Sequence, residues 1–223
     1  MKKNTSTVQL PVSSFSLFSK SYDLVVRNWQ IFAILSIIPF LSLLGNSKVD
    51  KYDINKLPSI SANAIVAIAS LGVVFAIVSL IIQVMTTALE LETGQDKTPN
   101  LRHLWGVAKK FWLRQLGLYI MIALMILGGL ILLIVPGIIM IRRYFLAPYI
   151  MLNEDLSINE TMRRSAALSK PYSGYVWGII GVAILLSLPS GIPRVGPYIA
   201  FILALFYSVA PALRYLELKK LTK

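Results

Sequence analysis

The feature that most constrains this chain is an apolar run, residues 117–152, in which Arg142 and Arg143 carry the only charges. As one helix, these 36 residues would be about 54 Å long, well beyond the roughly 30 Å hydrocarbon core of a bilayer. The run therefore predicts two membrane spans that meet at Pro136-Gly137, because proline interrupts a helix and glycine permits a turn. The alternative is one long kinked helix to about Ile141, followed by a re-entrant segment.

The composition of the whole chain agrees with an integral membrane protein. Hydrophobic residues make up 56% of the 223 residues and charged residues 14%, whereas soluble domains carry roughly 25% charged residues. The mean hydropathy is +0.69. Because the apolar runs are continuous rather than alternating, they favour an all-α, polytopic helical bundle over a barrel. We expect a single membrane domain, residues 1–223, without a cleaved signal peptide, because no apolar segment follows Lys2 and Lys3 directly.

Six transmembrane helices are expected in all. Their approximate bounds are residues 31–44, 60–89, 117–135, 138–152, 175–188 and 198–213. With the N-terminus inside, the segments on the inner side hold sixteen of the 22 Lys and Arg residues, and the outer segments hold four. This positive-inside bias predicts that both termini are cytoplasmic. The net charge of +12 then indicates contact with anionic headgroups rather than with nucleic acid.

Three amphipathic stretches precede the first, third and fifth spans, at residues 14–30, 101–115 and 157–177. Each combines apolar residues at helical spacing with basic residues and ends near a tryptophan, which is typical of a helix in the membrane interface. The fourth and sixth spans also end alike, because Glu154 follows Pro148, and Glu217 follows Pro211, by six residues. These patterns indicate a possible threefold internal repeat with units 14–92, 99–154 and 157–217. The alternative is that any hairpin entering from the cytoplasm acquires such flanks.

The most distinctive part of the sequence is residues 131–181. Its features are Pro136-Gly137, Arg142 and Arg143, Pro148, the acidic pair Glu154 and Asp155, the basic helix 160–165 and the aromatic stretch 175–177. The combination resembles the membrane domain family named after glycerophosphoryl diester phosphodiesterases, and is similar to the YciC-like proteins of the bacterial inner membrane. This resemblance implies a multi-pass helical membrane domain in the bacterial cytoplasmic (inner) membrane. It does not imply phosphodiesterase activity, since the chain has no room for that soluble catalytic domain.

No catalytic constellation is visible, and we expect a protein that is not an enzyme. His103 is the single histidine, the chain has no cysteine, and neither a nucleotide-binding nor a hydrolase motif is present. The ten acidic residues lie mostly in expected loops and interfaces, so that an intramembrane carboxylate cluster is not expected. We therefore expect no metal and no cofactor.

The arginine pair is the strongest candidate for a functional feature. An arginine at the centre of a span costs at least ~2.5–3.5 kcal/mol and marks a functional site by default. Three interpretations are open: an arginine extends to the outer headgroups, it faces the bundle and holds an anionic group, or it pairs with a carboxylate. A guanidinium suits phosphate because it offers paired donors in a fixed fork. The candidate lipid- or anion-binding residues are Arg142, Arg143, Arg163, Arg164, Lys109 and Lys110, and the candidate turn or hinge residues are Pro136, Gly137 and Pro148.

The leading functional hypothesis is a non-catalytic membrane protein that engages anionic phospholipid and supports the organisation or homeostasis of the bacterial inner membrane. One alternative is a small transporter or channel subunit for an anionic or lipid-like substrate, which requires a polar cavity beside Arg142 or Arg143. Another is an accessory subunit of a larger membrane complex. The expected partners are membrane lipids and, for these alternatives, a membrane protein or a second copy of the chain.

Overall fold

The computed structural model describes residues 10–49 and 61–222, with side chains for 10–44, 61 and 65–222. Within these ranges every regular element is helical, which confirms the all-α fold. The elements are α1 (Ser14–Arg27), α2 (Trp29–Val49), α3 (Ala62–Gly94), α4 (Leu101–Leu132), α5 (Ile134–Tyr144), α6 (Ala147–Glu154), α7 (Ile158–Ser169), α8 (Ser173–Ser187), the 3₁₀ turn η2 (Leu188–Gly191), α9 (Gly196–Tyr207) and α10 (Ala210–Leu221). The expected start of the second span at Ile60 lies outside the described residues.

Five segments of the described chain are long and apolar enough to cross a membrane. They are Ile65–Gly94, Leu101–Leu132, Ile134–Glu154, Ser173–Gly191 and Gly196–Leu221. A sixth is counted if α1 and α2, which meet at an angle of 96°, are taken as one bent span. By length and composition, the chain is a multi-pass helical membrane protein, as expected.

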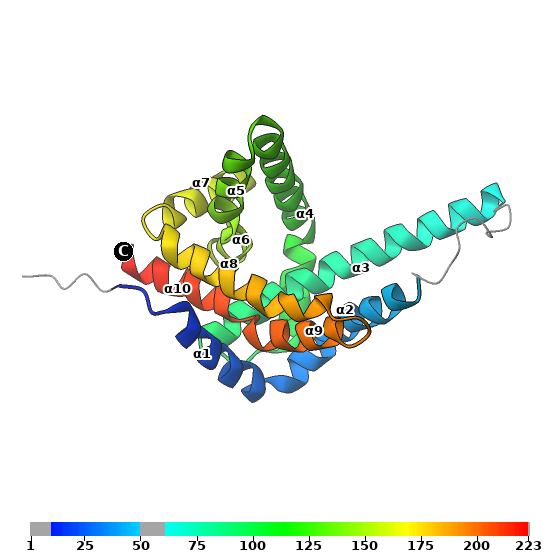
Figure 1. Ribbon diagram of the computed structural model, residues 1–223, viewed down its shortest axis with the longest axis horizontal. Coiled ribbons are helices and arrows are strands. Elements are labelled where there is room, and N and C mark those ends of the chain that lie inside the picture. Colours follow the sequence, from blue (N-terminus) through cyan, green and yellow to red (C-terminus); the bar gives the residue numbers. More distant parts are fainter. Residues whose placement is uncertain (1–9, 50–60, 223) are drawn as a thin grey trace, which may run out of the picture.

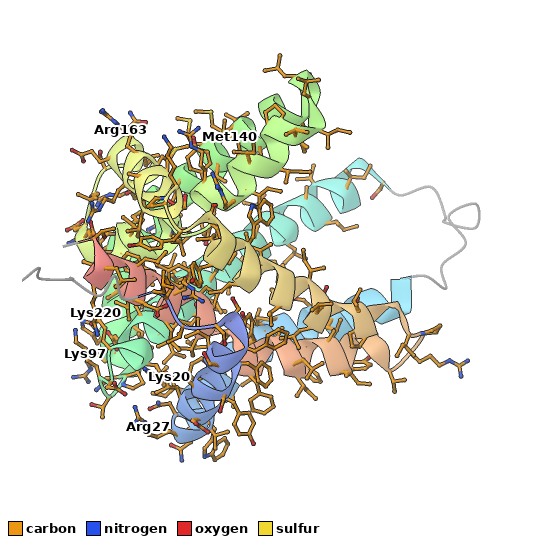
Figure 2. All side chains as sticks on the ribbon, turned by 60° about the vertical axis from the view of Figure 1, so that its left-hand side comes forward. Lys20, Arg27, Lys97, Met140, Arg163 and Lys220 are labelled. Atoms are coloured by element: carbon orange, nitrogen blue, oxygen red, sulfur yellow. The ribbon has the colours of Figure 1, made fainter. Side chains whose placement is uncertain are left out.

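The helices form three arms on a common base (Figure 1). The first arm pairs α2 with α3, the second pairs α4 with α5, and the third pairs α8 with α9. The base consists of α1, α6, α7 and α10, together with the end of α3 and the start of α4. The first and third arms remain in contact, because the Phe40 ring lies 6.1 Å from that of Tyr198 and 5.6 Å from that of Phe201. Lys20, Arg27, Lys97, Arg163 and Lys220 all lie on the base side, away from the arm tips (Figure 2).

The packed core lies in the base rather than along the arms. Leu89, Leu104 and Ile150 are completely buried there. By contrast, Leu71 in the first arm is 69% exposed and Ile131 at the tip of the second arm is 85% exposed. Exposed apolar side chains of this kind are stable against lipid tails, which are as apolar as leucine. The base is therefore the part of the protein that holds the three hairpins together.

The turn between the expected third and fourth spans lies at Leu133, three residues before the predicted position. Leu133 is extended, with φ −163° and ψ 144°, and α5 begins at the next residue. Pro136 and Gly137 thus lie within the first turn of α5 rather than at a turn. Proline is tolerated there because the first N–H groups of a helix have no partner within it. Gly129 and Gly137 pack closely against each other, since a Cβ on Gly129 would lie 3.0 Å from the Gly137 Cα.

The three stretches that were expected to form interfacial helices fold in different ways. The first is a separate helix, α1, because the chain bends at Asn28. The second is not separate, because α4 continues without a break into the membrane span. The third ends at Ser169 as α7, earlier than expected, and α8 begins at Ser173.

Both Ala-Pro pairs begin a new helix after a break. The first break separates α5 from α6 just before Pro148, and the second separates α9 from α10 just before Pro211. Each break is bridged by a serine of a base helix: Ser165 Oγ donates to the Arg143 carbonyl at 2.7 Å, and Ser21 Oγ donates to the Phe206 carbonyl at 2.7 Å. Arg143 and Phe206 both lie four residues before the alanine of the pair. The same kind of serine-to-carbonyl hydrogen bond therefore occurs at the break in two of the proposed repeat units. The threefold repeat as a whole stays a prediction.

Candidate anion-binding site

Two of the candidate arginines lie on one cavity, although twenty residues separate them in the sequence. This basic cavity has a volume of about 390 Å³ and lies between α4, α5 and α7. Its lining residues are Met121, Met125, Arg143, Tyr144, Asn159, Met162, Arg163 and Ala166. Arginine side chains and an asparagine thus share one small space with three methionines.

Local sequence features explain how α5 and α7 bring the two arginines together. Ser157 caps α7 and forms a capping box with Glu160, which fixes where the helix begins. Asn159 and Arg163 then follow at a spacing of four, which places them on the same face of the helix. Arg143 lies in the last turn of α5, and its carbonyl accepts the hydrogen bond from Ser165. That bond holds the end of α5 against α7.

The charges of the basic cavity are not neutralised by the protein. Among the described residues, neither Arg143 nor Arg163 forms an ion pair with a carboxylate. Glu160 lies on the same helix as Arg163, but its carboxylate accepts hydrogen bonds from the side chain and the backbone amide of Ser157. These bonds, and to a lesser degree the charge of Arg163, hold the pKa of Glu160 below its usual range. Two guanidinium groups are therefore available to an anion beside an apolar methionine surface.

Arg142 has a different environment from that of its neighbour. Adjacent helical positions point about 100° apart, and Arg142 does not line the basic cavity. Its Nε is buried and has no hydrogen-bond partner among the described residues. Both arginines lie nine or ten residues beyond the turn at Leu133, about 15 Å along the helix. This places Arg143 at the base end of the second arm, next to α7.

The other three candidates interact within the base. Arg164 Nε lies 3.5 Å from a Glu154 oxygen, and Lys110 Nζ lies 2.6 Å from an oxygen of Asp155. Lys109 Nζ lies 5.2 Å from the centre of the Trp105 ring. None of the three lines the basic cavity. The structure thus brings together two of the six candidate residues, Arg143 and Arg163.

Sequence reasoning did not find a second, central cavity of about 520 Å³. It is lined by residues of all three arms and of the helices α6 and α10: Gln83, Thr86, Thr87, Glu90, Tyr119, Phe145, Pro148, Tyr149, Ala183, Leu186, Ala204, Tyr207, Ser208 and Pro211. A signal was present, because Gln83, Thr86 or Thr87, and Glu90 follow one another at spacings of three and four within an otherwise apolar helix. That spacing forms a polar stripe on one face of a span.

The single histidine contacts a carboxylate, because His103 Nδ1 lies 2.5 Å from a Glu92 oxygen. Within residues 10–49 and 61–222, no group of three or more His, Asp or Glu side chains is close enough to hold a metal ion. The arrangement of arms, base and cavities defines a multi-pass helical membrane protein. No protein-family model, curated protein or solved structure matches the chain.

Proposed function

We propose that this protein is a non-catalytic component of the bacterial inner membrane that binds an anionic phospholipid headgroup between Arg143 and Arg163. The observation that supports the proposal is the basic cavity, in which two arginines without a carboxylate partner among the described residues face one space. A role in the organisation or homeostasis of the membrane would follow from retention of such a lipid.

The chemistry of the basic cavity matches both parts of a phospholipid. Two planar guanidinium groups can each donate a pair of hydrogen bonds to a phosphate, and charge-assisted bonds of this kind are roughly twice as strong as neutral ones. Met121, Met125 and Met162 line the same cavity and provide a flexible apolar surface for the adjoining glycerol and acyl carbons. A free inorganic anion would use the arginines but not the methionines.

The distribution of basic residues supports the orientation that the proposal requires. The labelled lysines and arginines of α1, α7, α10 and the segment after α3 lie on the base side of the molecule (Figure 2). With the base facing the cytoplasm and both termini inside, the basic cavity would lie near the anionic headgroups of the inner leaflet. The resemblance to the membrane domain family named after glycerophosphoryl diester phosphodiesterases is part of the same proposal and adds no catalytic role.

The test is native mass spectrometry of the detergent-solubilised protein with phosphatidylglycerol or phosphatidylethanolamine. The parent should retain phosphatidylglycerol preferentially, and the double variant Arg143→Gln, Arg163→Gln should bind it at least about tenfold more weakly, because each arginine contributes charged hydrogen bonds. Lys109→Gln is the control for the single variant Arg143→Gln, since each removes one positive charge and Lys109 lies outside the cavity. The proposal fails if the parent and the double variant retain phosphatidylglycerol equally, or if the control loses as much of this binding as the double variant.

A transporter or channel subunit is the second candidate function. The central cavity favours it, because a polar space bounded by all three arms is a feature of membrane proteins that bind a substrate within the bundle. The cavity is lined by neither Arg142 nor Arg143, however, so an anionic substrate would not meet these arginines there. Uptake of labelled phosphatidylglycerol or inorganic phosphate across proteoliposomes that contain the protein, compared with empty liposomes, distinguishes transport from simple binding.

A further inference from the structure

The central cavity and the basic cavity have opposite chemistry. Among the described residues that line the central cavity, Glu90 is the single acidic side chain, and no lysine, arginine or histidine faces it there. The volume of about 520 Å³ is in the range of small-molecule sites. A phosphate would meet a carboxylate at this position, so the cavity is unsuited to the ligand proposed for the basic cavity.

Glu90 is a buried carboxyl group without a cationic partner in the described part of the chain. The residue is 7% exposed, and the hydrogen bond that it receives comes from the Tyr149 hydroxyl at 2.8 Å. Its neighbour on the same face of α3, Thr87, is equally buried. Burying a carboxylate is costly unless it is paired and hydrogen-bonded, and a single neutral donor satisfies it poorly. A bound cation would supply the missing charge.

Four hydroxyl oxygens of the central cavity can accept hydrogen bonds from a ligand. Thr86 and Thr87 donate their hydroxyl hydrogens to carbonyls of their own helix, at 3.0 Å each, so that oxygen lone pairs remain for a ligand. The Tyr207 hydroxyl and Ser208 Oγ are buried and have no partner among the described residues. Tyr207 is 3% exposed, so bulk water does not satisfy its hydroxyl. These four oxygens, together with Glu90, provide acceptors for a donor-rich cation.

We propose that the central cavity binds an ammonium group, with Glu90 as its counter-ion. An ammonium group has three N–H donors and no acceptor, which matches a lining of acceptors. Three tyrosines, Tyr119, Tyr149 and Tyr207, line the same space, and aromatic side chains are common in sites for ammonium and quaternary ammonium ions. One carboxylate is a poor site for a divalent metal, which takes several charged oxygen ligands. The ammonium group can come from an aminophospholipid headgroup that enters between the arms, or from a free amine.

Two binding measurements test this site. The protein is first reconstituted in nanodiscs of pure phosphatidylglycerol and titrated calorimetrically with ethanolammonium chloride and tetramethylammonium chloride. Native mass spectrometry in detergent then measures retention of phosphatidylethanolamine. Binding of the soluble amines identifies a free-amine site, whereas retention of phosphatidylethanolamine alone identifies a lipid-headgroup site. Either result is expected to depend on Glu90.

The decisive variant is Glu90→Gln, which keeps the side-chain shape and an acceptor for Tyr149 but removes the charge. It should weaken ammonium binding at least about tenfold, because a charged hydrogen bond is lost. Glu92→Gln is the matched control, since Glu92 lies two residues further along α3 and pairs with His103 outside the cavity. Tyr207→Phe removes one unpartnered hydroxyl and should weaken binding by a smaller factor, which keeps the test valid if Glu90→Gln does not fold.

The outcomes separate this site from the lipid site of the proposed function. Arg143→Gln should leave the calorimetric binding of the two soluble amines unchanged, because neither amine carries a phosphate and Arg143 does not line the central cavity. The ammonium site is excluded if neither soluble amine nor phosphatidylethanolamine binds the parent more tightly than Glu90→Gln, or if the Glu92→Gln control loses as much. Loss of anionic lipid binding at the basic cavity would not affect this conclusion.

Discussion

At the scale of single residues, adjacent side chains can have different roles because they leave a helix in directions about 100° apart. Arg142 and Arg143 are neighbours in sequence, yet Arg143 lines the basic cavity and Arg142 does not. A single side chain can also have two roles, as Asp155 does. It ends α6 in a left-handed conformation with φ 50°, and its carboxylate bridges to Lys110 at 2.6 Å and Arg114 at 2.5 Å on α4. One exposed residue therefore ends a helix and ties it to a second one.

The Asp155 bridge predicts a pH dependence of stability. Hydrogen bonds from Lys110 and Arg114 hold the pKa of Asp155 below its ordinary value of 3.8. A carboxyl group with a lowered folded-state pKa stabilises the fold above its ordinary pKa, and this contribution is lost as the pH falls through the lowered value. Asp155→Asn can keep the left-handed backbone but not the charge, so its unfolding midpoint should fall less than that of the parent as the pH falls below about 4.

Thermal or denaturant unfolding in a mild detergent, followed by circular dichroism at several pH values, measures this difference. Asp96→Asn is the matched control, because Asp96 also has a positive φ of 57° and pairs with Arg27 across an exposed contact. This pair has one basic partner and is more exposed than the Asp155 bridge, which has two basic partners, so the control should lose less stability than Asp155→Asn at pH 7. Equal acid sensitivity of Asp155→Asn and the parent would contradict the role of the bridge.

At the scale of elements, the second arm depends on a close contact between its two helices near the tip. Gly129 of α4 and Gly137 of α5 face each other there. A Cβ on Gly137 would lie 2.4 Å from Leu130 Cδ2 and 2.9 Å from the Leu130 backbone nitrogen. Since backbone cannot move as easily as a flexible side chain, the contact requires glycine at position 137.

Gly137→Ala should therefore destabilise the protein by about 1–3 kcal/mol, the usual cost of overpacking. Gly128→Ala is the matched control on the same hairpin, because a Cβ at Gly128 meets nothing within 4 Å. Alanine has the higher helix propensity, so this control should be neutral or slightly stabilising. Reversible unfolding in mixed detergent micelles compares the two variants, and equal stability of both would show that the α4–α5 contact is not required.

Hydropathy could predict the helical spans because their composition alone decides whether they are stable in lipid. It could not place the turn at Leu133, because no glycine or proline occupies that position and the contact between Gly129 and Gly137 is tertiary. The basic faces of the interfacial stretches predicted Arg163 as a candidate. Its meeting with Arg143 depends on the Ser165 hydrogen bond between α7 and α5, which spans 22 residues and leaves no local pattern. The central cavity is lined by residues of all three arms. The sequence therefore contained the polar stripe on α3 but did not show which other residues face it.

At the scale of the whole molecule, three apolar arms diverge from one basic, packed base (Figure 1). Lys97 and Lys220 lie on the base side (Figure 2), whereas Arg194 lies in the connection between α8 and α9 at the end of the third arm. If the base faces the cytoplasm, as the distribution of Lys and Arg predicts, these positions lie on opposite sides of the membrane.

Cysteine labelling tests this orientation directly, because the chain contains no cysteine. In intact spheroplasts, an impermeant maleimide should label Arg194→Cys but neither Lys97→Cys nor Lys220→Cys. The two base positions should react after the membrane is permeabilised. Labelling of all three from outside, or of the base positions alone, would reverse or exclude the proposed topology.

The hydrogen bonds of Ser21 have a consequence for biosynthesis. Ser21 belongs to α1, but the groups that it bridges, the Phe206 carbonyl and the Val209 amide, are 185 and 188 residues later in the chain. During synthesis, α1 is therefore made well before the residues that Ser21 contacts. Until they are made, the amphipathic helix α1 lacks these contacts. We therefore expect these contacts of α1 with the segment between α9 and α10 to form only after the last hairpin has been inserted.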